Sequence, residues 1–153
     1  MVKLLDRQLI RSYFKARPGV PRFLAEAKAE ALRNGYVRDR GGRIRYLPGV
    51  FSSNPAIREE ALRQSHSHKI SGTAQWIKKR ALKRIWHEIR DLPRWEVEPL
   101  LEIHDEFLLE FKAERKDWVG AMLVKCMSAD SNLFKVPIKA KFGCGPNWGV
   151  LKD

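Results

Sequence analysis

Cysteine is scarce in this chain of 153 residues, which contains only Cys126 and Cys144. Two cysteines are too few for a disulfide framework or for a cysteine-based metal cluster. Their neighbouring residues are apolar or typical of loops. We therefore expect both side chains to be reduced thiols in an intracellular protein.

Long apolar runs are also lacking. No stretch approaches the length of about 20 residues that crosses a membrane, and residues 1–6 lack the apolar core of a secretory signal. No internal repeat, linker or low-complexity tract interrupts the chain. We expect a single domain over residues 1–153 of a soluble, cytoplasmic protein with no membrane partner.

Two kinds of ligand site lack their usual sequence pattern. His66 and His68 are two positions apart, on different faces of a helix, and no carboxylate or cysteine has the spacing of a zinc ligand set that would include His87. The glycines at 41–42 and 143–145 do not follow a strand and open a helix, as phosphate-cradling loops do. The sequence therefore favours turns at the glycines and argues against zinc.

The chain does contain much basic charge and enough apolar residues for a core. It has 30 Lys+Arg against 18 Asp+Glu, a formal net charge of +12, with 44% hydrophobic and 10% aromatic residues. This is the composition of a globular protein whose surface attracts polyanions. Nucleic acid is the first candidate and an acidic membrane face the second, while a merely soluble basic surface is a third interpretation.

Apolar residues recur at helical spacing in some segments and at strand spacing in others. The order of these segments indicates an α+β fold, with helices packed on a small antiparallel β-sheet that has a central β-hairpin. The expected helices span residues 5–14, 21–34, 56–68, 74–89 and 114–127, and the expected strands span 36–38, 43–47, 100–103, 107–111 and 136–142.

The central hairpin is predicted where apolar residues flank the polar insert His104-Asp105-Glu106. The flanking runs predict two short buried strands, with the insert as their turn. Adjacent carboxylates held together repel each other, so a compensating cation such as a divalent metal would stabilise them. An ordinary solvated turn is the other interpretation of this tripeptide.

A second predicted hairpin carries arginines interleaved with tyrosines and turns at Gly41-Gly42. Such a hairpin is suited to a phosphate backbone, and a solvated hairpin edge is the alternative. The side chains concerned are those of Tyr36, Arg38, Arg40, Arg43, Arg45 and Tyr46.

Eight short motifs occur in a characteristic order and at compatible distances along nearly the whole chain. They are Tyr13-Phe14, Pro18-Gly19-Val20, Gly35-Tyr36-Val37, Gly42-Arg43-Ile44-Arg45-Tyr46-Leu47-Pro48, Arg63, Ser71-Gly72-Thr73-Ala74, His104-Asp105-Glu106 and Gly145-Pro146-Asn147-Trp148. Together they resemble the C-terminal palm and fingers part of family A DNA polymerases.

This resemblance implies that the His-Asp-Glu insert is the third motif of a polymerase active site. Asp105 would coordinate catalytic Mg²⁺, Glu106 would support the metal site and His104 would lie near the primer terminus. Phosphoryl transfer to an incoming nucleotide needs hard oxygen ligands around two metal ions, which agrees with carboxylates at this position.

The resemblance also implies contacts with primer-template DNA. It places Arg63 against the duplex, where a guanidinium suits a phosphate or a minor-groove acceptor, and puts Arg43 and Arg45 on a basic hairpin nearby. The helix with Arg63 usually continues to an Asn and a Gln that touch the duplex, but here Ser67 and Ser71 take those places. Hydroxyls are shorter and offer fewer hydrogen-bonding edges, so base-pair checking is not carried over to them.

Two upstream parts of the family have no counterpart in this sequence: the first metal-binding motif and the nucleotide-binding helix. We therefore expect the chain to be inactive alone, as the C-terminal fragment of a split, phage-like DNA polymerase in the host cytoplasm. A complementary N-terminal chain would complete its two-Mg²⁺ site and its binding of dNTP. The alternatives are a non-catalytic double-stranded-DNA-binding polymerase remnant and a truncated product that folds only partially. We also expect exposed apolar surface and self-association of the isolated chain.

Overall fold

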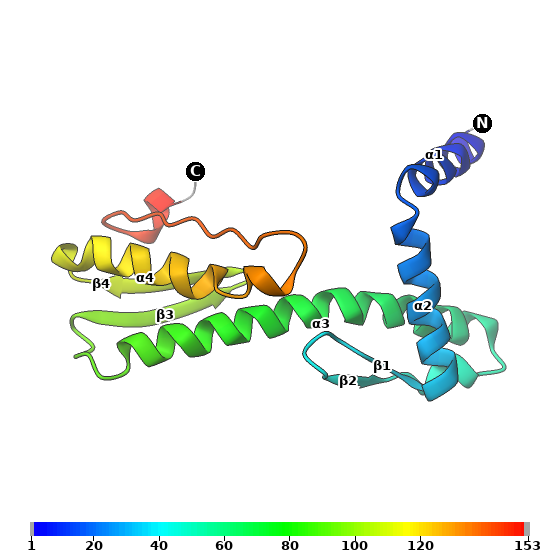
Figure 1. Cartoon of the computed structure of the whole chain (residues 1–153), viewed down its shortest axis with the longest axis horizontal. Helices are drawn as coiled ribbons and strands as arrows, with labels where there is room; N and C mark the ends of the chain where they lie inside the picture. Colours follow the sequence, from blue (N-terminus) through cyan, green and yellow to red (C-terminus); the bar gives the residue numbers. More distant parts are fainter. Residues whose placement is uncertain (1, 152–153) are drawn as a thin grey trace. The chain divides into compact units, whose positions relative to one another are not determined.

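The computed structural model describes the backbone of residues 2–151 and the side chains of residues 8–151 (Figure 1). The chain divides into two compact units, unit 1 with residues 1–76 and unit 2 with residues 77–153. Helix α3, Pro55–Ile89, contributes residues 55–76 to unit 1 and residues 77–89 to unit 2. The single domain expected from the sequence stays a prediction.

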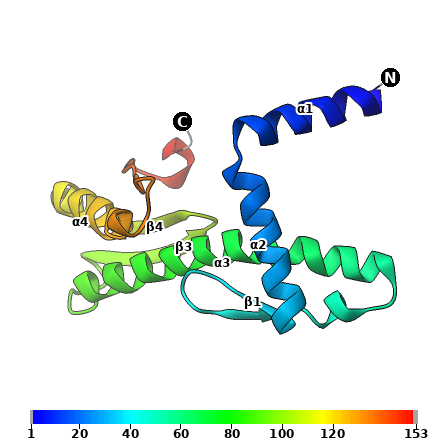
Figure 2. The same cartoon turned by 45° about the vertical axis from the view of Figure 1, so that its right-hand side comes forward.

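Unit 1 consists of helices and one small hairpin, as predicted. Its elements are α1 (Val2–Ala16), α2 (Gly19–Asn34), β1 (Tyr36–Arg38), β2 (Ile44–Tyr46), the short 3₁₀ helix η1 (Pro48–Phe51) and the first part of α3. Gly35 ends α2 with a left-handed φ of 72°, and its N–H donates to the backbone oxygen of Ala31 at 2.8 Å. The chain then enters β1 directly (Figure 2).

The core of unit 1 is small because only one face of each element is apolar. It contains Ala31, Val37, Leu47, Val50, Ala61 and Leu62. Glu30 on α2 ties this core to its neighbours, because it accepts the backbone N–H of Arg38 at 2.9 Å and pairs with Lys69 at 2.6 Å. Burial alone would raise the pKa of Glu30, but these bonds outweigh burial and hold that pKa below its usual value.

Helix α3 corrects the prediction of two helices separated near Ser71-Gly72-Thr73. The structure has one helix of 35 residues that runs through this tripeptide. A Cβ atom at Gly72 would come within 2.8 Å of Asp39 Oδ2, so glycine is needed here for close packing and does not break the helix. Thr73 Oγ1 donates to the backbone oxygen of Lys69 at 2.6 Å, within the helix.

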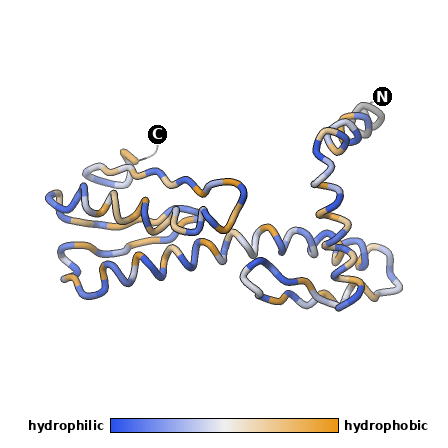
Figure 3. The backbone as a smooth tube through the Cα atoms, in the orientation of Figure 1, coloured by the Kyte–Doolittle hydropathy of each residue, from blue (hydrophilic) through white to orange (hydrophobic). Residues whose placement is uncertain are grey.

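Unit 2 is an antiparallel hairpin packed with two helices (Figure 1). The hairpin joins β3 (Val97–Ile103) to β4 (Glu106–Phe111), and η2 (Ala113–Arg115), α4 (Lys116–Ser128), η3 (Ser131–Leu133) and η4 (Trp148–Leu151) follow. Apolar and polar residues alternate along α3 where it faces this core (Figure 3). The buried core consists of Ile85, Ile89, Val97, Val119, Met122, Leu123 and Cys126.

The two strands of the central hairpin are confirmed, but the prediction that they are buried is wrong for part of β3. Leu100 and Leu101 are 47% and 50% exposed. The register shifts between Pro99 and Leu101, and this irregularity marks a bulge in β3. One stretch of the hairpin therefore presents apolar side chains to solvent.

The edge strand predicted over residues 136–142 is wrong. This segment is irregular, and Val136 is 73% exposed. Ser131 Oγ accepts the backbone N–H of Ile138 at 3.0 Å and lies 2.9 Å from its backbone oxygen. A segment with alternating apolar and polar residues forms a strand only if a neighbouring strand supplies backbone hydrogen bonds. Here the backbone of Ile138 bonds the side chain of Ser131 instead.

Asp130, just after α4, fixes this end of the unit to α3. Its side chain is 3% exposed and accepts hydrogen bonds from Arg80 and Arg84, with Arg84 Nη2 at 2.6 Å from Oδ1. These bonds, above all those from Arg84, lower the pKa of Asp130 to about 2 in spite of its burial.

None of the helices in the described part of the chain is both long and apolar enough to cross a membrane. Cys126 is buried in the core of unit 2, and burial raises the pKa of its thiol, whereas Cys144 is exposed.

Candidate functional site

The predicted metal-binding tripeptide lies at the tip of the β3–β4 hairpin. Ile103 pairs with Glu106, so the turn consists of His104 and Asp105, and Glu106 is the first residue of β4. The prediction that all three residues form the turn is therefore wrong for Glu106. His104 has a φ of 50°, in the left-handed region that residues other than glycine rarely adopt.

The three tip side chains are exposed and accessible to an ion or to a nucleic acid. The backbone of the tip is held from α3, because Lys78 Nζ donates a hydrogen bond of 2.9 Å to the backbone oxygen of His104. Lys78 also forms an ion pair with Glu102 on β3. The backbone of the acidic tip is thus anchored to α3, although its side chains are exposed to solvent.

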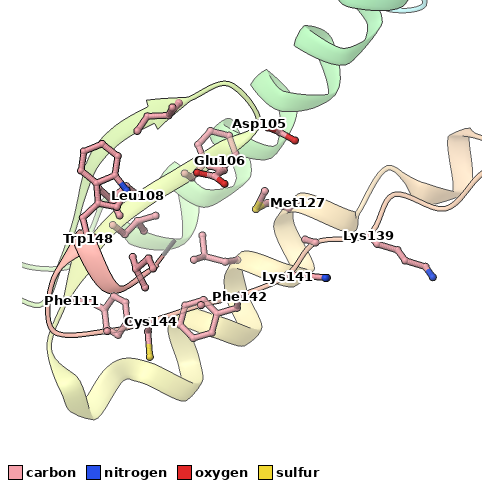
Figure 4. A pocket seen from close by; sticks show the side chains of 18 residues that line it. Asp105, Glu106, Leu108, Phe111, Met127, Lys139, Lys141, Phe142, Cys144 and Trp148 are labelled. Atoms are coloured by element: carbon pink, nitrogen blue, oxygen red, sulfur yellow. The ribbon is translucent and has the colours of Figure 1, made fainter. Parts of the chain in front are cut away.

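A cavity of about 700 Å³ extends from the hairpin tip along one face of β4 (Figure 4). Asp105 and Glu106 line it near the tip, and Lys139 and Lys141 line it from the irregular segment that follows η3. Its apolar lining includes Phe107, Leu109, Phe111, Leu123, Met127 and Phe142. The lining therefore has two acidic residues near the tip, an apolar wall and two lysine residues on the irregular segment.

The donor set of the tip fits part of a Mg²⁺ site. Carboxylate oxygens are the hard ligands that Mg²⁺ prefers, and Asp105 and Glu106 supply them side by side in the sequence. Within residues 2–151, however, no group of three or more His, Cys, Asp or Glu residues is arranged to hold a metal ion. Further ligands would have to come from outside this set.

Arg43, predicted to contact DNA, has structural partners in unit 1. Its Nε lies 3.0 Å from Asp39 Oδ2, and its Nη2 donates to the backbone oxygen of Gly72 at 3.4 Å. Asp39 is 5% exposed, and although burial works to raise its pKa, the bonds from Arg43 keep that pKa below its usual value. Arg43 therefore joins the β1–β2 hairpin to α3, with 44% of its side chain still exposed.

Three of the predicted DNA-binding residues share one face of α3. Arg63, Ser67 and Ser71 are four residues apart in turn, so their side chains project from the same side of the helix, and all three are exposed. Arg63 pairs with Glu60, and its side chain is 62% exposed. Arg45 on β2 bonds Gln64 Oε1 at 3.0 Å, which links the hairpin to this helix.

The predicted site residues fall into two sets. The five residues predicted to bind DNA belong to unit 1, and the three tip residues belong to unit 2. In unit 1 the predicted residues lie on one hairpin and one helix, and in unit 2 they lie at the tip of one hairpin.

The sequence pattern did not single out Lys78, which supports the tip, or Asp39, which holds Arg43. It also did not single out Asp130, which joins the end of α4 to Arg80 and Arg84 of α3. Each of the three makes contacts to residues distant in sequence or across a turn. One signal was available for Lys78, because this lysine directly follows Ile77, which lies on the apolar face of a predicted helix. The positions of its partners were not available from the sequence.

The fold is that of a partial polymerase domain. It is similar to the solved structure described as the POL domain of Pol1 from M. smegmatis in complex with DNA primer-template and dNTP, with a TM-score of 0.86 and 29% sequence identity. The similarity covers 96% of this chain and 26% of that chain.

The sequence model of DNA polymerase family A matches residues 6–150, so the chain belongs to this family. It is 34% identical over 139 residues to DNA polymerase I of Deinococcus radiodurans, covering 91% of this chain and 14% of that protein. It is 30% identical over 144 residues to the thermostable DNA polymerase I of Thermus aquaticus, covering 94% and 17%. The chain thus spans less than a fifth of the length of these relatives.

Proposed function

We propose that this chain is the C-terminal part of a DNA-directed DNA polymerase and that it works together with a separate chain that supplies the rest of the enzyme. The observation that carries this proposal is the His104-Asp105-Glu106 tip, held on a rigid hairpin within a family match that covers residues 6–150. Similarity to a polymerase domain in complex with primer-template and dNTP supports it.

In this proposal Asp105 binds catalytic Mg²⁺, Glu106 supports the same site and His104 lies beside the primer terminus. When bound there, Mg²⁺ would supply charge neutralisation and activation of the primer hydroxyl. The tip itself contributes accessible carboxylates whose backbone is anchored to α3 by Lys78, so little ordering is needed when an ion binds.

The ligand count supports partner dependence. Two adjacent carboxylates cannot surround two metal ions, and the described residues contain no larger group of metal ligands. The chain also exposes apolar side chains that a partner would bury, including Leu9 at 72%, Leu101 at 50% and Val136 at 73%. The isolated chain is therefore expected to be inactive.

Unit 1 provides the proposed DNA contacts. A polar row on α3 consists of Arg63, Ser67 and Ser71. Arg45 is connected to the same helix by its hydrogen bond to Gln64. Arg43 is the weaker candidate, since part of its guanidinium is engaged by Asp39. Residues 1–76 contain 15 Lys+Arg and 6 Asp+Glu, a charge balance that favours binding to phosphates.

The test is reconstitution. The chain is mixed with the complementary N-terminal part of a family A polymerase, and extension of a labelled primer is followed with Mg²⁺ and dNTPs. We expect extension only in the mixture, and we expect Asp105→Ala to lower its rate by about a thousandfold or more, because loss of a ligand weakens the stabilisation of charge at the reacting phosphate. Asp117→Ala, which removes another exposed carboxylate from α4, is the matched control and should leave the rate within about twofold.

A mixture that never extends the primer, or an Asp105→Ala variant with intact activity, would contradict the proposal. If extension is absent and duplex binding persists and weakens with salt, the non-catalytic DNA-binding remnant becomes the better interpretation. The basic balance of unit 1 is the observation that favours this second candidate.

A further inference from the structure

Lys78 is the residue of α3 that reaches the hairpin tip. Its side chain is only 14% exposed, although lysine is among the residues most often found at the surface. The ammonium group has two partners, the backbone oxygen of His104 at 2.9 Å and the carboxylate of Glu102. The next residue, Lys79, is exposed on the same helix and provides a natural comparison.

The two interactions of Lys78 have different roles: one neutralises its charge and the other fixes the geometry of the turn. Covering an ammonium group is unfavourable unless an anion and further hydrogen bonds compensate for lost water, and Glu102 supplies the anion. Because the side chain of Glu102 is 39% exposed, this carboxylate can be hydrated without Lys78. The carbonyl of His104 is a neutral acceptor, so the bond to it acts mainly on geometry.

The carbonyl that Lys78 binds belongs to the strained residue of the turn. Among the described residues, His104 is the only non-glycine with a positive φ, and its value is 50°. A residue in this region persists only when surrounding contacts hold it there. The hydrogen bond fixes the direction of the His104 carbonyl, and therefore fixes the peptide plane that leads to Asp105.

We infer that Lys78 is a positioning residue for the hairpin tip. Through the His104 carbonyl it holds the left-handed turn, and this turn sets the direction in which the Asp105 carboxylate projects. Glu102 neutralises and orients the ammonium group. The consequence for metal binding depends on the proposed function, whereas the ordering of the tip does not depend on it.

The first test measures order at the tip of the isolated chain by amide hydrogen exchange, resolved by NMR. Lys78→Met keeps most of the apolar stem and removes both interactions. Exchange of the amides of residues 103–107 should become about tenfold faster, because a charge-assisted hydrogen bond that closes the turn is lost. Lys79→Met removes the same charge one residue away and should change these rates by less than twofold.

Glu102→Gln separates anchoring of the carbonyl from ion pairing. The glutamine oxygen still accepts a hydrogen bond from Lys78, so exchange at the tip should rise by no more than about threefold. Exchange within α4 and within the β1–β2 hairpin reports whether each variant is folded. If Lys78→Met accelerates exchange throughout unit 2, the double variant Lys78→Met/Glu102→Gln, which leaves no unneutralised carboxylate, is measured in its place.

The inference is overturned if tip exchange in a folded Lys78→Met variant, or in the double variant, stays within twofold of the unchanged chain. It is also overturned if Glu102→Gln is as disruptive as Lys78→Met, because the ion pair and not the carbonyl bond would then order the turn.

The second test uses the reconstituted polymerase. Lys78→Met should raise the Mg²⁺ concentration for half-maximal primer extension by about fivefold to tenfold while the Kd for duplex DNA changes less than twofold. Lys79→Met should leave the Mg²⁺ requirement unchanged. An unaltered Mg²⁺ requirement in an active Lys78→Met enzyme would overturn the link to Asp105. If reconstitution itself fails, the proposed function is contradicted, but the hydrogen-exchange experiment on the isolated chain still decides whether Lys78 orders the tip.

Discussion

The two units of the chain contain equal numbers of basic residues and use them differently. Unit 1 has 15 Lys+Arg and 6 Asp+Glu, a net charge of +9, whereas unit 2 has 15 and 12, a net charge of +3. In unit 2 many basic side chains form ion pairs with acidic residues of the same unit, such as Lys78 with Glu102 and Arg84 with Asp130. Acidic residues therefore balance most of the basic charge in unit 2, whereas unit 1 keeps a large excess of basic charge.

A second contrast appears in the buried aspartates Asp39 and Asp130, each of which pairs with arginine in its own unit. Asp39 in unit 1 accepts a short-range pair from Arg43 four residues away. Asp130 in unit 2 accepts two arginines, Arg80 and Arg84, from about fifty residues earlier in the chain. Because loss of Asp130 leaves two arginines without their anion and loss of Asp39 leaves one, removing Asp130 should cost more.

The largest expected effect comes from removing Asp130. Asp130→Ala leaves two arginines facing a site without an anion and should lower the free energy of unfolding of unit 2 by about 3 kcal/mol. Asp39→Ala should lower that of unit 1 by about 2 kcal/mol, because a single, partly exposed arginine loses its partner. Urea unfolding followed by circular dichroism gives both values, with Asp117→Ala as the surface control. Equal losses at Asp39 and Asp130 would break the comparison.

The pH dependence of stability sharpens the same contrast. The pKa of Asp130 is about 2 in the folded chain against an ordinary 3.8, so its contribution is present above pH 4 and is lost as the pH falls from about 4 to 2. At about 1.4 kcal/mol for each pKa unit, the loss amounts to about 2 kcal/mol.

Urea midpoints measured between pH 2 and 6 should therefore fall more steeply with acid in the unchanged chain than in Asp130→Asn. Asparagine does not titrate, so the acid dependence of the Asn variant measures the contribution of all other carboxylates. Parallel curves for the two proteins would show that Asp130 is not held ionised by its arginines.

A smaller effect is expected from Gly72, where α3 meets Asp39. Gly72→Ala adds helix propensity worth about 1 kcal/mol, but the new Cβ would lie 2.8 Å from Asp39 Oδ2 and force a buried side chain to move. We expect a net loss of about 1 kcal/mol in thermal or urea unfolding. Gly19→Ala, where nothing lies within 4 Å of the new Cβ, is the control and should be neutral or slightly stabilising. Stabilisation by Gly72→Ala would remove the packing explanation for the uninterrupted helix.

The smallest effect concerns binding to duplex DNA. Arg63→Gln in unit 1 should weaken duplex binding about threefold and reduce the slope of log K against log salt by about one, as expected for one lost phosphate contact. Lys116→Gln in unit 2 also removes an exposed positive charge and should change neither quantity measurably. Fluorescence anisotropy at several salt concentrations measures both. Equal effects of the two variants would mean that duplex DNA does not bind unit 1 in preference to unit 2.

Local patterns predicted most of the elements. The helix ending at Gly35, the two hairpins and the helix over residues 116–128 were all expected from periodicity and turn residues, because these signals depend on neighbours a few residues away. The family was also expected from the order of its motifs, and the match over residues 6–150 confirms it. The roles of the tip residues and of the predicted DNA contacts stay predictions.

The main errors occurred where contacts or strand pairing, and not the local pattern, decide the outcome. Gly72 looked like a break between helices, yet Asp39, 33 positions earlier, occupies the space that a side chain would need. Residues 136–142 alternate as a strand does, yet Ser131 takes up the backbone of Ile138. Leu100 and Leu101 looked buried, yet the bulged β3 exposes both.

Residue type and local spacing are enough to predict most of the elements, the basic charge and the acidic tripeptide between two apolar runs. The left-handed turn at His104, and the contact by which Lys78 of α3 holds it, depend instead on tertiary packing. The physical reason is that an ammonium group and a carbonyl 26 residues apart meet only after the hairpin has packed against the helix.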